Sequence, residues 1–151
     1  MKQKLKLALV GAGERGQYCY APYAKMHGYE IEFVAVADPH KGRREKFVQD
    51  YHVPAEGVFE TAEQFFARPR MADAVLICTQ DSQHYAYACQ AIDLGYSILL
   101  EKPISPSVRE CLDLQRRAEE KGTQIMVCHV MRYTKFYRKL KELIDSGVIG
   151  D

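Results

Sequence analysis

Three glycines near the N-terminus have the spacing of a phosphate-binding turn. Gly11, Gly13 and Gly16 form a GxGxxG motif that directly follows the apolar run 5–10. Between a strand and a helix, the first glycine permits a tight turn, the second lets the backbone approach a pyrophosphate, and the third lets the helix pack closely on the strand. A glycine-rich turn without a ligand is the alternative. We favour the dinucleotide interpretation and expect contacts from the whole motif, namely Gly11, Ala12, Gly13, Glu14, Arg15 and Gly16.

An acidic residue stands where dinucleotide-binding folds place the group that holds the adenosine ribose. Asp38 ends the apolar run 31–37, and it follows Gly16 by about 20 residues, as that role requires. Its carboxylate can accept hydrogen bonds from both ribose hydroxyls. Because Pro39 follows it, Asp38 is also a good N-cap for the next helix, with proline in the first helical position. The two roles are compatible, and we favour the ribose role.

The same carboxylate bears on which nicotinamide dinucleotide would bind. A 2′-phosphate beside Asp38 would meet a like charge, so the sequence favours NAD over NADP. Four basic residues follow Asp38 and could neutralise a 2′-phosphate, although such a cluster is often only a solvated helix face: His40, Lys41, Arg43 and Arg44. NAD is therefore the expected cofactor, and NADP stays open.

Polar residues follow three later apolar runs, where the carboxyl ends of strands would lie. They occupy positions 79–84, 101–103 and 129–133. In doubly wound folds, ligands bind beyond the carboxyl ends of the strands. The segment 101–103 is the most suggestive of chemistry, because an acid and a base, Glu101 and Lys102, directly follow an apolar run. The alternative is a strand that ends in solvent at a proline.

These residues would be positioned by alternating strands and helices. The apolar runs that predict strands are 5–10, 31–37, 58–59, 74–78, 97–100 and 124–130. The stretches that predict helices are 16–26, 39–51, a short helix after the Thr61…Gln64 capping box, 82–94, a helix from the Ser107…Glu110 capping box to 121, and 134–145 before Gly147. Continuous apolar strands are covered on both faces, and strand–helix repetition means parallel pairing with right-handed crossovers. The expected fold class is an α/β, doubly wound parallel (Rossmann) sheet with helices on both faces.

The composition fits a single cytoplasmic domain and excludes several other classes. The chain has 151 residues, 47% of them hydrophobic, and a net charge of +1, so neither nucleic acid nor a membrane is expected as a partner. No apolar run approaches the roughly 20 residues that cross a bilayer. The five cysteines form no CxxC pair and suit reduced thiols in the cytoplasm. No metal site is expected, because adjacent Cys128 and His129 would point to opposite faces of a strand.

Taken together and in order, these motifs resemble the Gfo/Idh/MocA oxidoreductases, a family that includes glucose–fructose oxidoreductase and inositol dehydrogenase. The matching features are Gly11–Gly16, Asp38, the turn from Thr79 to His84, Glu101-Lys102-Pro103, and the tail from Arg132 to Gly150. The resemblance covers essentially the whole chain. One departure is Gln80, because the family usually has a Thr-Pro pair where this chain has Thr79-Gln80.

The resemblance implies a nicotinamide cofactor and hydride transfer to or from a sugar, a polyol or a similar small molecule. It implies that Lys102 is the catalytic lysine in contact with substrate, with Arg132 and Tyr133 as further substrate contacts. An ammonium group beside a reacting hydroxyl can donate a proton to oxygen or, once deprotonated, accept one. The family pattern also implies cofactor contacts beyond the glycine turn and Asp38, from Thr79, His84, Glu101 and Pro103.

The resemblance further implies that this chain is the cofactor-binding half of a longer enzyme. Residues 1–151 would form the NAD(P)-binding domain, with a core of about 1–130 and a junction helix at about 134–146, and the family's C-terminal α+β substrate domain is absent from this chain. The chain alone is then expected to be inactive and to self-associate, and the parent is expected to be a homo-oligomer through the missing domain. Two other functions stay open: an NAD-dependent glycosidase of the same family, and a non-catalytic dinucleotide-binding module.

Overall fold

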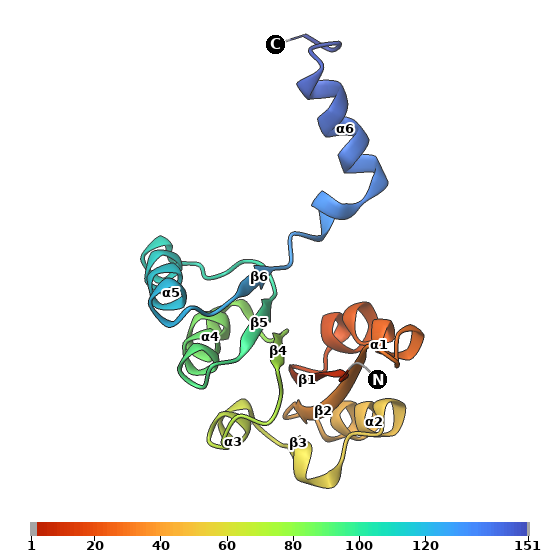
Figure 1. Cartoon of the computed structure of the whole chain (residues 1–151), viewed down its shortest axis with the longest axis vertical. Helices are drawn as coiled ribbons and strands as arrows, with labels where there is room; N and C mark the ends of the chain where they lie inside the picture. Colours follow the sequence, from red (N-terminus) through yellow and green to blue (C-terminus); the bar gives the residue numbers. More distant parts are fainter. Residues whose placement is uncertain (1–2, 151) are drawn as a thin grey trace.

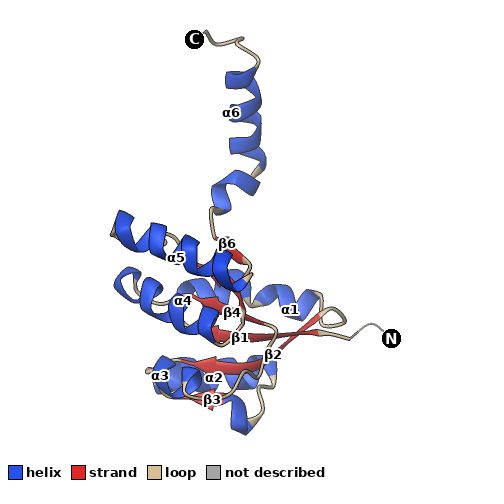
Figure 2. Ribbon diagram, turned by 60° about the vertical axis from the view of Figure 1, so that its left-hand side comes forward, coloured by secondary structure: helices blue, strands red, loops and turns tan. Residues whose placement is uncertain are grey.

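Six parallel strands form one sheet with helices on both faces (Figures 1 and 2). The computed structural model describes residues 3–150 of the chain. The strand order is β3-β2-β1-β4-β5-β6, and every neighbouring pair is parallel. The strands are β1 (Leu5–Val10), β2 (Ile31–Ala37), β3 (Val58–Phe59), β4 (Ala74–Ile77), β5 (Ser97–Leu100) and β6 (Ile125–Val127). This order is that of a doubly wound Rossmann sheet, so the predicted fold class is confirmed.

The helices lie in two layers, one on each face of the sheet (Figure 1). One layer holds α3 (Ala62–Phe66), α4 (His84–Asp93) and α5 (Val108–Lys121). The other holds the wide-turn helix η1 (Glu14–Tyr20), α1 (Pro22–Met26) and α2 (Lys41–Tyr51). The short helices η2 (Ala55–Gly57), η3 (Asp81–Gln83) and η4 (Val130–Tyr133) lie in connections. The last helix, α6 (Lys135–Asp145), extends away from the body (Figure 2). No helix within residues 3–150 is long and apolar enough to cross a membrane.

The alternation of side chains along the strands divides the core into two layers. Ala8 and Val10 of β1 belong to the cluster that packs with α3, α4 and α5. Leu7 and Leu9 belong to the cluster on the other face, where the ring of Phe47 from α2 is fully buried. Burial on both faces is therefore confirmed for β1. It does not extend to the whole sheet, because β5 and β6 are not covered by a helix on the α1 side (Figure 1).

Glycines stand at the points where the first strand, turn and helix approach most closely. A Cβ atom on Gly16 would collide with the carbonyl oxygen of Gly11 and would lie 2.8 Å from Cδ1 of Leu9. Gly11 has a φ of +95°, and a Cβ atom there would lie 2.5 Å from the carbonyl oxygen of Cys78. The glycine motif therefore packs η1 directly on β1, as its spacing predicted.

Two predicted boundaries differ for local reasons. The helix predicted at 16–26 is two helices, because the N–H of Ala21 donates to the carbonyl of Gly16 at 3.0 Å in an i→i+5 turn and α1 then begins at Pro22. Pro22 has no N–H with which to continue the first helix. The strand predicted at 124–130 ends at Val127, whose carbonyl accepts from the N–H of His129 at 2.8 Å as the chain turns away.

Of the two hydrogen bonds expected in the first predicted capping box, Thr61…Gln64, one is present. Thr61 Oγ1 accepts from the N–H of Gln64 at 3.2 Å, but the Gln64 side chain accepts from Glu60 and not from Thr61.

The second capping box is wrong. The side chain of Ser107 makes no capping hydrogen bond. The hydroxyl of Ser105, two residues upstream, donates to the Glu110 carboxylate and accepts from the N–H of Ser107 at 2.9 Å.

We expect Gly16→Ala to destabilise the fold, because its Cβ must displace the Gly11 backbone or the Leu9 side chain. Overpacking of this kind costs about 1–3 kcal/mol in the free energy of unfolding, which urea denaturation would measure. Gly13→Ala is the matched control, because the nearest atom to its Cβ would be Nη1 of Arg43 at 3.9 Å. Equal stability of the wild type and Gly16→Ala would contradict the close packing of η1 on β1.

Candidate functional site

A cleft opens at the carboxyl ends of β1, β2 and β4, all on the same side of the sheet because the strands are parallel. It has a volume of about 370 Å³. The chain order along the sheet reverses between β1 and β4, which is where doubly wound folds bind ligands. The cleft is lined by Gly11, Gly13, Glu14, Arg15, Asp38, Pro39, Arg43, Cys78, Thr79, Gln80 and Gln83. It therefore brings the glycine turn, the acid after β2 and the threonine after β4 to one place.

The glycine turn is anchored to the neighbouring strand and open on the side of the cleft. The N–H of Gly11 donates to the carbonyl of Ala37 at 2.8 Å. At Gly13, Nη1 of Arg43 is the one atom from elsewhere in residues 3–150 that lies within 4 Å of the position that a Cβ would take, at 3.9 Å. The N–H groups in the first turn of a helix have no acceptor within that helix. An anion can therefore approach the backbone here without a side chain in the way.

Asp38 has only 4% of its surface exposed, and its carboxylate holds the glycine turn. Oδ2 accepts from the N–H of Ala12 at 2.7 Å, and Oδ1 accepts from the N–H of His40 at 2.8 Å. A carboxylate has about four lone-pair sites, so capacity for a ligand remains. The prediction that Asp38 caps the next helix is wrong. That helix begins at Lys41, and its N-cap is His40, whose Nδ1 accepts from the N–H of Arg43 at 3.3 Å.

The basic residues after Asp38 have different surroundings, and Arg43 is the one that lines the cleft. Arg44 is buried, and its Nη1 donates to the carbonyl of Asp38 at 2.7 Å. Lys41 is exposed, with its Nζ 3.7 Å from Oε1 of Glu45. Within residues 3–150, the guanidinium of Arg43 forms no ion pair. Of the four basic residues that follow Asp38, Arg43 is thus the one that a ligand in the cleft can contact.

The turn after β4 carries a shielded hydroxyl and a buried histidine. Oγ1 of Thr79 is hidden from solvent and has no hydrogen-bond partner within residues 3–150. His84 is fully buried, with Nδ1 at 2.6 Å from the carbonyl oxygen of Pro103 and Nε2 at 3.2 Å from that of Thr79. His84 therefore lies beneath the surface and connects the turn after β4 to the segment after β5.

A buried acid connects the glycine turn to the end of β5. The side chain of Glu101 is only 5% exposed, and its Oε1 lies 3.3 Å from Nε of Arg15. The same carboxylate accepts a hydrogen bond from the hydroxyl of Tyr20 and, at 3.0 Å, from the N–H of Lys102. Burial, with hydrogen bonds to Cys128 and Glu101, raises the pKa of Tyr20, so its hydroxyl stays a donor at physiological pH.

The predicted substrate residues are exposed. Lys102 projects from the carboxyl edge of the sheet, and within residues 3–150 its ammonium makes no ion pair. Its peptide bond to Pro103 is cis. Arg132 and Tyr133 lie in η4 beyond the end of β6, where Tyr133 is 59% exposed. The part of the chain that the structure describes shows no hydrogen bond between either residue and Lys102.

Two polar residues at the site were not singled out from the sequence. Tyr20 bonds to Glu101, and its spacing of four residues from Gly16 was a usable signal, because it places both on one helical face. Gln83 lines the cleft and forms a capping box with Gln80, in which each side chain accepts from the backbone of the other. A capping-box motif has Ser or Thr at its first position, so the sequence carried no signal for this one.

Comparisons with known proteins bear on the family and the fold of this chain. Residues 5–129 match the GFO_IDH_MocA model, described as an oxidoreductase family with an NAD-binding Rossmann fold. The chain is 32% identical to an inositol 2-dehydrogenase of Pseudomonas savastanoi over 97% of its own length and 43% of the relative's. It is 30% identical to scyllo-inositol 2-dehydrogenase (NAD(+)) of Bacillus subtilis, over 99% of this chain and 43% of the relative. The chain thus spans less than half the length of these relatives.

Solved structures show the same fold. An oxidoreductase from Thermotoga maritima superposes with a TM-score of 0.85 and 26% identity, over 99% of this chain and 45% of that one. The WlbA dehydrogenase of Chromobacterium violaceum, solved with NADH and UDP-GlcNAcA, gives a TM-score of 0.85 at 18% identity, over 97% of this chain and 41% of that one. At that identity the second likeness shows the fold alone. With the family model matched across most of the chain, the protein belongs to the Gfo/Idh/MocA oxidoreductases and contains their NAD-binding Rossmann fold.

Proposed function

We propose that the cleft binds a nicotinamide dinucleotide and that the chain is the cofactor-binding half of an oxidoreductase. The observation that carries this proposal is an open glycine turn beside a buried carboxylate, since Gly13 faces the cleft without a side chain and Asp38 lines the same cleft. A pyrophosphate suits the first feature, and a ribose diol suits the second. The chain covers 43% of its relatives' length, so the reaction and the substrate are proposals about the longer protein.

The residues around the cleft fit such a cofactor. On this proposal, residues 11–16 hold the pyrophosphate and Asp38 holds the ribose. Oγ1 of Thr79 is shielded and unpartnered within residues 3–150, and a buried polar atom without a partner costs about 1–3 kcal/mol. A ligand that bonds to this hydroxyl would remove that cost. Glu101 and Pro103 would shape the rest of the cofactor site, and His84 would support it from below.

We propose NAD as the preferred cofactor and NADP as the second choice. Buried Asp38 opposes a 2′-phosphate, and of the four basic residues that follow it, Arg43 is the one that lines the cleft. The relatives include both kinds, because two inositol dehydrogenases of Bacillus subtilis are named for NAD(+) and for NADP(+). The balance between Asp38 and Arg43 would therefore set the preference in this chain.

Lys102 is the proposed catalytic residue. A bound nicotinamide would supply the hydride chemistry, and the protein would supply positions and a proton. The ammonium of Lys102 is exposed at the carboxyl edge, so it can hydrogen-bond to a substrate oxygen and transfer a proton there. Glu101 and His84 are positioning residues, because the first accepts from the N–H of Lys102 and the second holds the carbonyl of Pro103.

We propose a sugar, a polyol or a similar small molecule as the substrate. Relatives named inositol dehydrogenases support this class. Arg132 and Tyr133 would contact the substrate together with Lys102. Further domains of the longer protein would complete the site and its homo-oligomer, and the chain alone would be inactive. The five free thiols are compatible with a location in the cytoplasm.

Two alternatives differ from this proposal in what they release. An NAD-dependent glycosidase would use the same cleft but yield free sugar without net NADH, whereas a dehydrogenase yields oxidised product with NADH. A non-catalytic module would bind the cofactor and turn nothing over in the longer protein. Assays of the longer protein with free polyols and with glycosides, followed by NADH absorbance and by sugar release, separate the three.

We expect Asp38→Ala to weaken NADH binding by about 1–3 kcal/mol, the cost of leaving a hydrogen-bonding partner unpaired. Titration calorimetry on this chain would measure it. Asp38→Asn keeps the shape and one acceptor oxygen, so its loss should be smaller. Unchanged affinity in Asp38→Ala would show that the carboxylate serves only to hold Ala12 and His40.

We expect the wild type to bind NADH more tightly than NADPH at physiological salt, and Arg43→Ala to widen that gap. Loss of one charge-assisted hydrogen bond corresponds to about tenfold or more in NADPH affinity. Lys41→Ala is the matched control, because Lys41 is a cation on the same helix that does not line the cleft. Tighter binding of NADPH than of NADH by the wild type would overturn the predicted preference.

In the longer protein, we expect Lys102→Ala to lower kcat by about 10²–10⁴, the usual contribution of a positioned acid or base. NADH affinity should be nearly unchanged, because the proposed contact of Lys102 is with substrate. Lys121→Ala, which alters an exposed lysine at the far end of α5, is the control. A loss of less than tenfold would make Lys102 a structural residue at a strand end.

A further inference from the structure

The side chain of Arg15 lies between the cleft and the segment that carries Lys102. It lines the cleft together with Gly13. Its Nε is 3.3 Å from Oε1 of Glu101, and Oε2 of the same carboxylate accepts from the N–H of Lys102 at 3.0 Å. Two successive contacts therefore connect the cleft to the backbone of Lys102.

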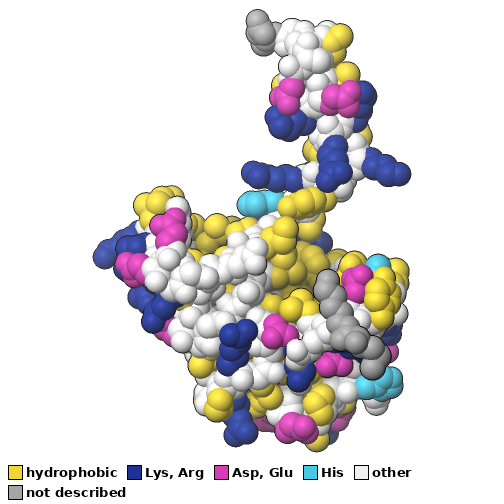
Figure 3. Space-filling view, in the orientation of Figure 1, with side chains coloured by type: hydrophobic (Ala, Val, Ile, Leu, Met, Phe, Trp, Pro, Cys, Tyr) yellow, Lys and Arg dark blue, Asp and Glu magenta, His cyan; other side chains and the backbone are white. Residues whose placement is uncertain are grey.

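The two side chains of η1 that contact Glu101 differ in what surrounds them. The hydroxyl of Tyr20 donates to the carboxylate, and Tyr20 also lines an apolar hollow, which Figure 3 shows between the α1 and α5 sides of the body. Burial raises the pKa of Tyr20, so its hydroxyl keeps its proton and this bond. Arg15 approaches from the cleft, and its side chain is 43% exposed. Arg15 is therefore the partner of Glu101 that a ligand in the cleft can reach.

Arg15 also has hydrogen-bond donors to spare. A guanidinium carries five N–H donors and no acceptor. Nη1 lies 3.8 Å from Sγ of Cys19, and Nη2 forms no hydrogen bond or ion pair within residues 3–150. The ion pair with Glu101 is a single contact through Nε, without the second, parallel bond of a bidentate pair. A phosphate group in the cleft can therefore attract this guanidinium.

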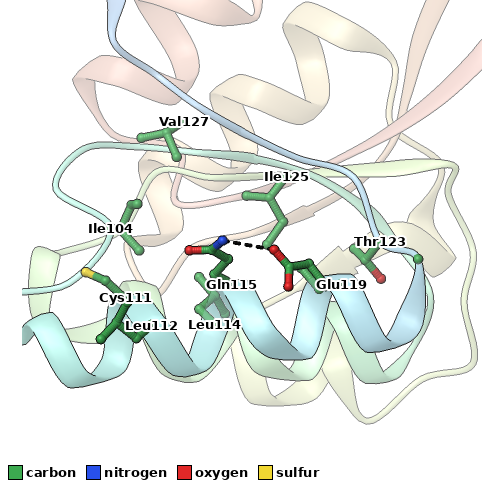
Figure 4. Close-up of a pocket in the computed structure, with 11 residues that line it drawn as sticks. Ile104, Cys111, Leu112, Leu114, Gln115, Glu119, Thr123, Ile125 and Val127 are labelled. Atoms are coloured by element: carbon green, nitrogen blue, oxygen red, sulfur yellow. Dashed lines mark hydrogen bonds between the residues drawn. The ribbon is translucent and has the colours of Figure 1, made fainter.

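The chain beyond Lys102 is anchored by other contacts. The carbonyl oxygen of Pro103 lies 2.6 Å from Nδ1 of the buried His84. Ile104 lines the groove between β6 and α5 together with Leu114 (Figure 4). In the segment 102–104, the N–H of Lys102 is thus the group whose hydrogen bond depends on Glu101.

We propose that Arg15 is a positioning residue for Lys102: its guanidinium turns from Glu101 toward a phosphate in the cleft, and the carboxylate then bonds more strongly to the N–H of Lys102. A buried carboxylate that loses part of its counter-charge relies more on its remaining hydrogen bonds. Filling the cleft therefore stiffens the backbone that carries the proposed catalytic lysine. The inference rests on the proposed binding of a dinucleotide in this cleft.

The test measures hydrogen exchange of the Lys102 amide by NMR while the cleft of this chain is filled with NADH or, separately, with inorganic pyrophosphate. Titration calorimetry gives the Kd of each probe. Variants are compared at equal multiples of their own Kd, so that the general stabilisation by a bound ligand is the same. In the wild type, either probe should slow exchange at Lys102 by about two- to fivefold beyond that general effect, the scale of a partly exposed ion pair.

Arg15→Gln removes the charge of this side chain and keeps an amide that can donate a hydrogen bond. It should weaken the binding of both probes about tenfold, the scale of one charge-assisted hydrogen bond, and it should abolish the additional slowing at Lys102. Arg15→Lys keeps the charge without the planar fork and should retain part of the slowing. Arg43→Gln is the matched control, because it removes another cation that lines the cleft, and its Lys102 amide should respond as in the wild type.

Three results would overturn the proposal. No additional slowing in the saturated wild type would mean that Lys102 is independent of the cleft. Equal slowing in Arg15→Gln would mean that another route connects the cleft to Lys102. Binding of neither probe would remove both the positioning role and the proposed function. By contrast, a chain that binds pyrophosphate with the expected response but does not bind NADH would keep the role of Arg15 and contradict the dinucleotide site.

Discussion

The buried carboxylate of Glu101 is the interaction on which the rest of the site depends. A buried charge is costly unless it is paired and hydrogen-bonded, and here the partners come from the other half of the sheet. Arg15 and Tyr20 approach from η1, and the N–H of Lys102 follows in the chain. The side chain of Arg15 is 43% exposed, so solvent screens its attraction to the carboxylate, and the hydrogen bonds from Tyr20 and from the Lys102 N–H satisfy the rest of the buried group. Glu101 therefore joins the end of β5 to the helix that follows the glycine turn, and it also orients the backbone of Lys102.

Local spacing was enough to predict the parts of the site that adjoin a single strand. The glycine turn follows β1 directly, the acid ends β2, and the apolar runs give the strands whose parallel order brings these ends together. The contact between Arg15 and Glu101 was not predictable in this way, although each residue was singled out. It depends on β1 and β5 both lying beside β4, which is a property of the strand order and not of any motif.

Where one sequence pattern is compatible with two roles, contacts with residues distant in the chain determine how the side chain is oriented. An aspartate before a proline suits a helix N-cap as well as a ribose ligand, and the N–H of Ala12 settles its orientation by taking one carboxylate oxygen. The buried position of His84 has the same origin, because the carbonyl of Pro103 that binds it is 19 residues away in the chain. The apolar run at 124–130 correctly predicted a strand but not its burial, because Met126 is 52% exposed and the helix that follows stands apart from the body (Figure 1).

The parallel sheet also determines where a complete site must be closed. Every strand ends on the edge that carries the cleft and Lys102, so the chain after β6 leaves from that edge too. A lysine exposed there acts in water, where electrostatic interactions are weakest, and catalysis by such a group needs a cover that excludes solvent and orients the substrate. Residues 129–133 lie between this edge and α6 in the chain. On the proposed function, Arg132 and Tyr133 in this short segment would form a second wall of the substrate site once such an element covers the edge.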